Sequence, residues 1–586
     1  MKYGNIELTG SLDVSGSFVV PSGTSLPDET STPDGSLFYD TTNSVLCGLI
    51  SGSWNTMPTV AGSDPYSSPL EYLVVAGGGG GGGWGGGGGA GGLLSGSTTD
   101  LSSGSVVTVT VGAGSAGGQL SQNAGGYVQG IDGSNSSLAA TGFTTVTAIG
   151  GGGGGKHNGY TADAGRDGGS GGGAGMHAGT TAKGAGGSGT AGQGSAGGAG
   201  GQSSSGNAVY YRGGGGGGAS EVGEEGNGHN AGGNGGDGAA STITGTSVTY
   251  AGGGGSHTDR RSGGGITAGG AGGGGAGGGY QPDTHAGNGT VNTGGGGGGS
   301  YGYANSHQGG GGSGVVVISY YSGSFNSIGG HESDAGSGKK AHKFSSSGTF
   351  FVGASTDFQI VTDDLLVHYD FANAATWDGS ASTITDLQGN HNLSVVSSPT
   401  LDLTHGGGLS LDGIDDYAVK TSISYTPYMV EIWLTSDIGI DSGTYTDSTY
   451  AIPLGLGDYP GGFTFGAYTG IATNESIGFW GANYQSTGLT YIRDSFSAGT
   501  YQIVANWNGS SYDIWVNGSK KTAYASTNPG NTTLHARDTI YLGKEDHPSQ
   551  SYEFGGRIHN VKIYSAQKSD ADVTQNWNAL RKRFGL

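Results

Sequence analysis

Runs of consecutive glycine dominate the middle of this chain, from Gly77 to Gly314, and they restrict its folding more than any other feature. Roughly two residues in five are glycine there, against about 7 % in ordinary proteins. An apolar segment leads into the runs at 72–76, and another leaves them at 315–320. Because a flexible linker has no need of flanking β-strand signals, we expect an ordered glycine-rich domain over 71–320.

Glycine sets the physical terms of such a domain. Each glycine loses about 0.5–1 kcal/mol more than alanine in backbone entropy on folding, and it has no side chain to bury. Stabilisation must come from backbone hydrogen bonds between closely packed segments. Extended helices with three residues per turn make no internal hydrogen bonds, so their backbone groups can bond neighbours. The runs at 213–218 and 294–299 lack the Gly-X-Y repeat of collagen. We therefore predict a backbone-bonded polyglycine bundle, with a disordered linker as the alternative.

The segments between the runs carry varied polar and aromatic side chains. Loops on a rigid frame are where binding residues concentrate, and aromatic rings supply contact area at low entropic cost. The residues that we predict to contact a receptor are Lys156, His157, Tyr160, Tyr210, Tyr211, Arg212, Tyr280, Tyr301 and Tyr303. The alternative is structural: these tyrosines cover the bundle ends or fill contacts between subunits.

The order of strand, glycine runs and strand resembles the glycine-rich domain of bacteriophage tail and fibre proteins. The resemblance rests on Leu-Val-Val-Ala at 73–76 and on Gly-Val-Val-Val-Ile-Ser-Tyr at 314–320. In adhesins of that type the runs form packed polyglycine II helices, and the loops contact the bacterial surface. The resemblance implies the same arrangement here.

The composition favours a protein that works on an exposed surface. The net charge is −22 and only 11 % of residues are charged, so the surface is mostly neutral and polar, which suits contact with sugars and not with nucleic acid. Cys47 is the single cysteine, which excludes an intrachain disulfide. We see no signal peptide and no apolar stretch of ~20 residues, so we expect no membrane insertion. We expect synthesis in a host cytoplasm and a final location on a virion surface.

The amino-terminal segment, 1–70, shows alternating strand signals at 6–18 and a hairpin signal at 35–50 that ends at Trp54. It is similar to a module of phage fibre proteins. Because one short copy cannot bury enough apolar surface, we expect three chains to share a core, which makes the protein a homotrimer. An isolated small β domain is the alternative. This module would attach the chain to other virion tail or capsid proteins.

A short bridging segment, 321–364, follows the glycine-rich domain. Ala341–Phe344 and Thr349–Val352, separated by Ser-Ser-Ser-Gly, predict a hairpin at the end of that domain.

From 365 to 586 glycine becomes sparse, and short strand signals recur between turns. This spacing predicts a β-sandwich, with Asn517-Gly518 as a two-residue hairpin turn. The last element is predicted to be a short helix, capped by Ser569 and carrying an apolar stripe of Val573, Trp577, Leu580 and Phe584. The expected fold class is thus mainly β: a β-strand attachment module, a polyglycine bundle, and a jelly roll with a carboxy-terminal helix.

This last domain resembles the concanavalin A-like, laminin-G-like jelly roll. The residues that carry the resemblance are 386–390 (Asp-Leu-Gln-Gly-Asn), 409–417 (Leu-Ser-Leu-Asp-Gly-Ile-Asp-Asp-Tyr), 514–518 (Ile-Trp-Val-Asn-Gly) and the closing segments 558–564 and 569–573. The family includes sugar-binding lectins, calcium-dependent protein binders and glycoside hydrolases, so the fold alone does not choose between them.

Few residues of this domain suggest chemistry. The Glu-x-Asp-x-x-Glu strand of sandwich hydrolases is absent, and Glu431 stands beside Ile432 and Trp433, so we expect no catalysis. Asp412, Asp415 and Asp416 supply hard oxygen ligands that suit Ca²⁺. We favour the alternative that they only form a turn, with no cofactor required. The histidines show no metal-binding spacing.

We predict a virion fibre or adhesin subunit that recognises a bacterial surface glycan or outer-membrane protein without catalysis. The alternatives are a purely structural head or tail fibre or decoration protein, and a glycan depolymerase.

Overall fold

The computed structural model of the protein is mainly β, as predicted. The description leaves out residues 1–21, 24–36, 41–44, 51–52, 57–68, 118–127, 159–160, 177–183, 206–207, 227–231, 259–265, 280–284, 302–306, 323, 354–357, 404–406, 437–450, 458–462, 469–475, 481–488, 493–497, 510–511, 523, 526–535 and 545–552. The chain divides into two units, Met1–Ser67 and Ser68–Leu586.

The first unit contains a small sheet in the order β1-β2-β3-β4, with bounds Ser22–Gly23, Leu37–Asp40, Val45–Ile50 and Ser53–Thr56. β2 and β3 pair antiparallel, with Leu37 opposite Gly48, which confirms the predicted hairpin. The strand signal at 6–18 lies outside the described residues.

Two sheets form the base of the glycine-rich domain. One has the order β17-β18-β16-β5-β6, with bounds His331–Gly336, Lys339–Phe344, Val315–Tyr321, Leu70–Val75 and Leu93–Thr98. The other has the order β19-β7-β8-β9, with bounds Gly348–Phe351, Val106–Thr110, Ser136–Ala140 and Phe143–Ala148. The two strands that bracket the glycine runs pair directly, with Val75 opposite Val315. The segments 73–75 and 315–318 of these strands are apolar because both of their faces are buried, one in each of two side-chain clusters.

The prediction that 341–344 and 349–352 pair as a hairpin is wrong. Both segments are strands, but β18 pairs with β17 and β16, whereas β19 pairs with β7 of the other sheet. The hairpin lies one segment earlier, between β17 and β18, where Ser337 and Gly338 both have positive φ, as a tight hairpin turn requires. With both of its edges bonded, β18 has no edge left for β19.

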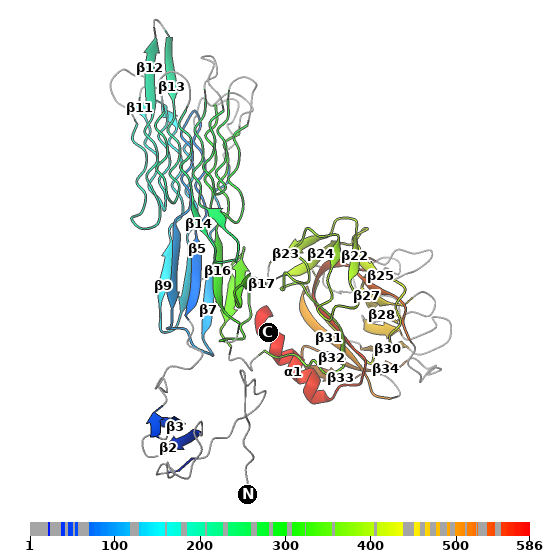
Figure 1. Cartoon of the computed structure of the whole chain (residues 1–586). Coiled ribbons are helices and arrows are strands. Elements are labelled where there is room, and N and C mark those ends of the chain that lie inside the picture. Colours follow the sequence, from blue (N-terminus) through cyan, green and yellow to red (C-terminus); the bar gives the residue numbers. More distant parts are fainter. Residues whose placement is uncertain are drawn as a thin grey trace. The chain divides into compact units, whose positions relative to one another are not determined.

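The glycine runs extend beyond these sheets as side-by-side segments along the long axis of the domain (Figure 1). Backbone bonds repeat every third residue in the first run: Gly77, Gly80 and Gly83 donate to Ser134, Ile131 and Val128, Gly78 and Gly81 donate to Gly312 and Gly309, and Gly79 and Gly82 donate to Gly89 and Gly86. A period of three shows that the run faces three different neighbours, as a helix with three residues per turn does. The predicted backbone-bonded bundle is confirmed.

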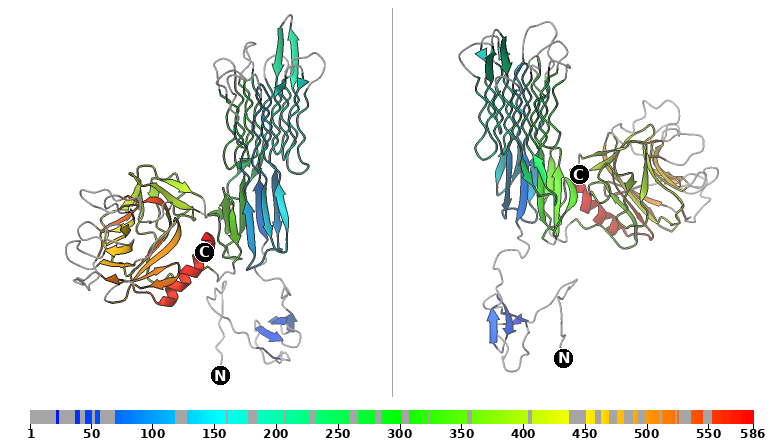
Figure 2. Two further views of the ribbon diagram at one scale, coloured as in Figure 1. Left: turned by 180° about the vertical axis from the view of Figure 1, so that it is seen from behind. Right: turned by 45° about the horizontal axis from the view of Figure 1, so that its top comes forward.

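Close approach, and not backbone conformation, explains glycine in the run 213–218. No residue of 213–218 has φ in the left-handed region, yet a Cβ on Gly216 would overlap the carbonyl of Gly88. In the part of this domain that the structure describes, three short hairpins interrupt the runs, namely β10–β11 (His157–Asn158, Thr161–Ala162), β12–β13 (Gly201–Ser205, Ala208–Arg212) and β14–β15 (Ala239–Ser241, Val248–Tyr250). β12 and β13 stand at the end of the bundle away from β5 and β16 (Figure 2).

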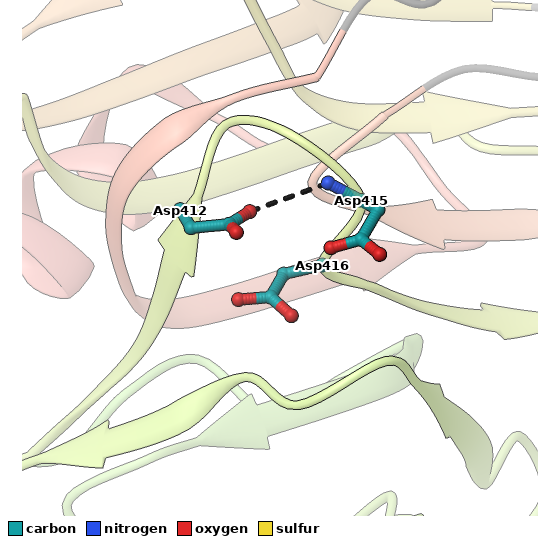
Figure 3. Close-up of side chains that lie close together, drawn as sticks. All are labelled: Asp412, Asp415 and Asp416. Atoms are coloured by element: carbon teal, nitrogen blue, oxygen red, sulfur yellow. Dashed lines mark hydrogen bonds between the residues drawn. The ribbon is translucent and has the colours of Figure 1, made fainter.

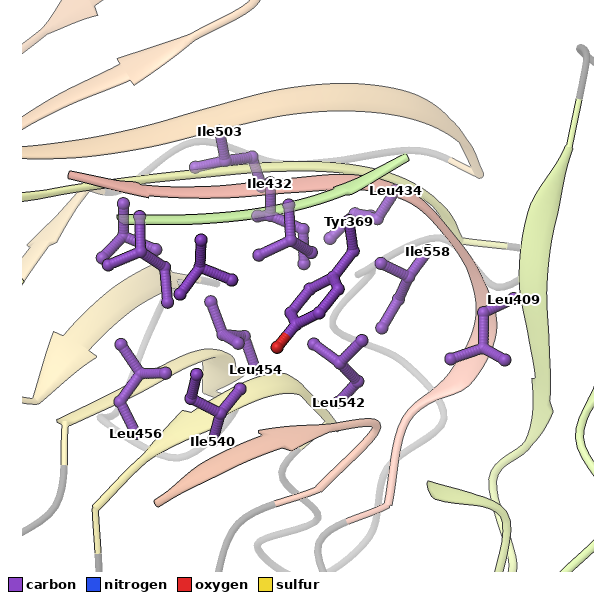
Figure 4. Close-up of a cluster of buried hydrophobic side chains, with 14 of the residues drawn as sticks. Tyr369, Leu409, Ile432, Leu434, Leu454, Leu456, Ile503, Ile540, Leu542 and Ile558 are labelled. Carbon is purple, nitrogen blue, oxygen red and sulfur yellow. The ribbon is translucent and has the colours of Figure 1, made fainter. Parts of the chain in front are cut away.

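The carboxy-terminal domain is a sandwich of two sheets, as predicted. The first has the order β23-β24-β36-β26-β31-β32-β33, with bounds Thr400–Asp402, Gly408–Asp412, Gly555–Tyr564, Met429–Ser436, Gly499–Trp507, Tyr512–Val516 and Ser519–Lys521, and β20 (Leu365–Asp370) also pairs with β36. The second has the order β21-β22-β25-β35-β27-β28-β29-β30-β34, with bounds Thr383–Ile384, Leu393–Val396, Tyr417–Lys420, Ile540–Leu542, Ala451–Leu456, Phe463–Tyr468, Ser476–Trp480, Leu489–Ile492 and Tyr524–Ala525. Side chains of both sheets fill the space between them, among them Ile432, Leu454 and Ile540 (Figure 4).

Local signals in this domain are confirmed. Asn517 and Gly518 have positive φ and join β32 to β33 as a two-residue turn. α1 (Asp570–Leu580) begins at Ser569, whose side chain accepts from the Asp572 N–H while Asp572 accepts in return, and the 3₁₀ helix η3 (Arg581–Phe584) follows. Among the described residues no helix has both the length and the apolar character that crossing a membrane requires.

Candidate functional site

The far end of the glycine bundle carries several of the predicted receptor residues. Trp84 sits with positive φ at a reversal between two runs, where Gly82 donates to Gly86. The Trp84 ring stacks on Tyr301 at 5.0 Å and on His157 at 5.6 Å between ring centroids. Both partners are buried, at 3 % and 9 % exposure. The structure therefore brings Tyr301 and His157 together in an aromatic cluster that closes the bundle end.

The other predicted receptor residues have different surroundings. The Arg212 side chain is fully buried at the end of β13, and the Lys156 ammonium is partly exposed, 3.9 Å from an Asp163 carboxylate oxygen. Tyr210 and Tyr211 lie on β13, opposite Ser203 and Gln202, but their side chains are not described. Tyr160, Tyr280 and Tyr303 lie outside the described residues. Receptor contact by this set stays a prediction.

Sequence reasoning missed Trp84 as a member of this group. Its signal was an aromatic residue alone between two glycine runs. A single large side chain at a reversal of otherwise bare backbone has the room to collect neighbouring rings.

The acidic turn of the sandwich connects β24 to β25. Asp412 Oδ1 accepts hydrogen bonds from the backbone N–H groups of Ile414 at 2.8 Å and Asp415 at 3.3 Å. These bonds, the Ile414 bond first, lower the pKa of Asp412. Gly413 has φ +73, which suits glycine at the reversal. This is the turn that we favoured in the sequence.

Asp416 is buried, and it bonds a different segment. Its Oδ1 accepts a hydrogen bond from the backbone N–H of Ser398 at 2.9 Å. One oxygen atom from each of the three carboxylates can be chosen so that all lie within 4.8 Å of one another (Figure 3). Three converging carboxylates are a donor set for a hard cation such as Ca²⁺. Asp412 and Asp416 each commit one oxygen to backbone N–H groups, so the turn explains them without a cation. A turn that needs no cation stays our prediction, with a calcium site as the alternative.

A pocket of about 400 Å³ opens beside this turn. It is lined by carboxylates and hydroxyls, namely those of Asp412, Asp415, Asp416, Ser397, Ser398, Thr400 and Ser410, together with Leu411. Such a wall offers many acceptors and several donors in a small volume. The sequence pointed to the three aspartates but not to Ser410 or to the preceding Ser-Ser-Pro-Thr segment at 397–400, which the fold brings beside them.

The carboxylate of Glu431 is not available for catalysis in this structure. It is fully buried, and it accepts hydrogen bonds from Trp433, Gln502, Lys562 and Asn576. The absence of catalysis in the whole chain stays a prediction.

Comparisons with known protein families match two parts of the chain. Residues 56–321 match the family model of a glycine-rich domain, and residues 422–574 match that of the concanavalin A-like lectin/glucanases superfamily. The second match begins after the acidic turn. A comparison with curated proteins finds no match.

Solved structures resemble only part of the chain. Domain 4 of AbnA, a GH43 extracellular arabinanase from Geobacillus stearothermophilus, solved with arabinotriose, is 15 % identical with a TM-score of 0.27 and covers 36 % of this chain and 98 % of that one. Trypanosoma rangeli sialidase is 13 % identical with a TM-score of 0.28 over 40 % of this chain and 34 % of that one. The binding domain of botulinum neurotoxin DC, in complex with rat synaptotagmin II, is 15 % identical with a TM-score of 0.28. The match covers 37 % of this chain and 52 % of that one. Values this low carry no functional argument.

Proposed function

We propose that this chain is a virion fibre or adhesin subunit that binds a carbohydrate of the bacterial surface without catalysis. The observation that carries the proposal is the pocket beside the acidic turn, because its carboxylates and hydroxyls match the hydrogen-bonding needs of sugar hydroxyls. The match to a lectin-containing superfamily supports it. The bundle would act as a rigid frame for the loops.

The direct test measures binding of the purified full chain to polysaccharide extracted from candidate host cells. Ser398 is exposed at the pocket wall, so Ser398→Trp should fill the pocket without disturbing the core. We expect affinity to fall at least about tenfold, with the melting temperature unchanged. Ser394→Trp, at an exposed position of the nearby strand β22, is the matched control and should bind normally.

Two results would reject the proposal. One is equal binding by Ser398→Trp and the control, and the other is no binding by the parent chain. Release of reducing ends during the incubation would instead indicate a depolymerase. Competition between the purified protein and particles for adsorption to cells tests the surface role, since a purely structural fibre would not compete.

The proposal includes a homotrimer, in which the amino-terminal module shares one core and attaches to other virion proteins. Light scattering of the full chain should give three times the subunit mass of 57.6 kDa. A single-subunit mass with 1–70 folded would contradict the trimer.

A further inference from the structure

Another cavity, of about 540 Å³, lies where the bridging segment meets the sandwich. Glu332 and Lys340 line it from β17 and β18, and Asp370, Asn560 and Arg583 line it from β20, β36 and η3. It shares no lining residue with the pocket beside the acidic turn. Its volume falls in the usual range for small-molecule sites, about 300–1,000 Å³.

The charges on this wall cancel in pairs. Lys340 Nζ lies 2.9 Å from Glu332 Oε1, and Arg583 donates to Asp370 Oδ1 at 2.7 Å. The two lining histidines are mainly neutral at pH 7, because burial lowers the pKa of His342 and lowers that of His368 to about 4. A charged ligand would meet no unpaired countercharge among these groups, whereas a neutral polar ligand would meet both donors and acceptors.

Asn560, in the same wall, has a buried polar atom without a hydrogen-bond partner among the described residues. Its side chain is fully buried, and its Nδ2 lies 3.2 Å from His368 Nε2. The atom without a partner is its Oδ1. Buried amide oxygens are normally satisfied, so this unpaired acceptor is unusual, although its full burial keeps it from direct contact with a ligand.

Phe358 supplies the aromatic part of the wall, and Ile328, Ile360, Leu387 and Leu580 supply further apolar surface. The φ of Phe358 is +56, a conformation that is rare for a bulky residue. Such outliers persist only where the surroundings impose them, and they gather at ligand sites. An aromatic ring next to hydrogen-bonding groups provides the two kinds of contact that a sugar ring makes, through its C–H face and its hydroxyls.

We propose that this cavity binds one neutral, pyranose-sized sugar unit, with the Glu332–Lys340 and Asp370–Arg583 pairs bonding its hydroxyls and Phe358 packing on the ring. The inference rests on the carbohydrate recognition proposed above, but at a separate place. Full burial on a central strand makes Asn560 itself a poor mutation target. The exposed rim residue Thr362 is a better one.

The experiment uses saturation-transfer NMR on the full chain with glucose, galactose and mannose, and with glucuronate and glucosamine as charged counterparts. We expect transfer to at least one neutral hexose and at least tenfold weaker binding of the charged sugars. Thr362→Trp should abolish transfer by closing the rim, and Asp363→Trp, at the exposed neighbouring position that does not line the cavity, should not. Phe358→Gly should also lose binding while it keeps the backbone, because glycine adopts positive φ freely.

Two results would overturn the inference: no transfer to any neutral hexose, as for a cavity that holds only water, or equal transfer in Thr362→Trp and the parent chain. The outcome is separable from that of the proposed function. Polysaccharide binding that only Ser398→Trp weakens, without hexose binding, rejects the cavity site alone. Hexose binding that only Thr362→Trp weakens, without polysaccharide binding, rejects the surface role and leaves the cavity site standing.

Discussion

Glu431 and Lys562 form an ion pair that is wholly enclosed, with Lys562 Nζ 3.1 Å from Glu431 Oε1 and both side chains at 0 % exposure. They stand opposite each other on β26 and β36. Asn576 of α1 donates to Glu431 Oε2 at 2.7 Å, so the pair also fixes the helix to the sheet. Burial raises the pKa of Glu431, but the Lys562 charge and the hydrogen bonds outweigh it and hold that pKa below its ordinary value.

Removing one partner of this pair should destabilise the domain strongly. Lys562→Met leaves a buried carboxylate without its countercharge, which typically costs about 3–5 kcal/mol of unfolding free energy. Denaturant unfolding measures the loss. Lys520→Met is the matched control, because Lys520 pairs with Asp513 at 2.8 Å with side chains 42 % and 28 % exposed, and it should cost less than about 1 kcal/mol. Equal losses would show that burial of the pair does not matter.

A single methyl group inside a glycine run should damage the bundle. In Gly216→Ala the new Cβ would overlap the Gly88 carbonyl, so backbones must separate and hydrogen bonds must lengthen. We expect a loss of at least about 3 kcal/mol, as for severe overpacking. In Gly348→Ala the Cβ would stand 3.6 Å from the Phe344 ring, an ordinary contact, so this control should melt near the parent. A parent-like melting curve for Gly216→Ala would refute the close packing of the runs.

Acid should weaken the region around β17. Burial, aided by Arg583 and Lys343 and opposed by Asp370, lowers the pKa of His331 to about 4. The folded state therefore prefers neutral His331, and its contribution is complete above about 6.5, the ordinary histidine pKa, and declines as the pH falls toward 4. Protonation of His331 should lower the free energy of unfolding by up to about 3 kcal/mol.

Unfolding free energies at pH 7.5 and 4.5 test this, with His331→Gln as the comparison. The variant should lose less stability between the two pH values than the parent does. Asp370, whose pKa lies at about 2, loses its contribution in a separate window below about 3.8. Identical pH profiles for parent and variant would contradict the role of His331.

We expect the acidic turn to hold without a metal ion. Backbone N–H groups already satisfy Asp412 and Asp416, so a chelator should leave the melting temperature unchanged. If Ca²⁺ raises the melting temperature of the parent but not of Asp415→Ala, the turn is a calcium site, since ligands stabilise the state that binds them. Asp363→Ala, an exposed aspartate away from the turn, is the control.

Sequence predicted best what neighbouring residues decide. The capping pair Ser569 and Asp572 and the Asn517-Gly518 turn depend on a few adjacent positions, and both are as expected. The two apolar segments that frame the glycine runs are strands, as the sequence indicated, but the pairing of Val75 with Val315 was not predicted.

The rest depended on partners that are distant in the chain. Nothing in Lys339–Phe344 shows that both of its edges are taken, so its pairing with the next segment looked sufficient. The candidate receptor residues were misjudged for the same reason, because their contacts are with distant segments. Tyr301 follows a glycine run in a polar segment, which is typical of a surface loop. It is buried because its ring stacks on Trp84, which is far away in the sequence. Within the runs one glycine is chemically identical to the next, so residue type could not assign neighbours.

The three-residue repeat of the bundle separates two kinds of evolutionary change. The frame is joined by main-chain atoms, which every amino acid carries, so substitutions and insertions at the reversals leave its bonds intact. One residue added within a run would turn all later N–H groups by about 120°, toward the wrong neighbour. Such a lineage can vary its tips freely, while the length of each run and the glycines inside it remain under selection.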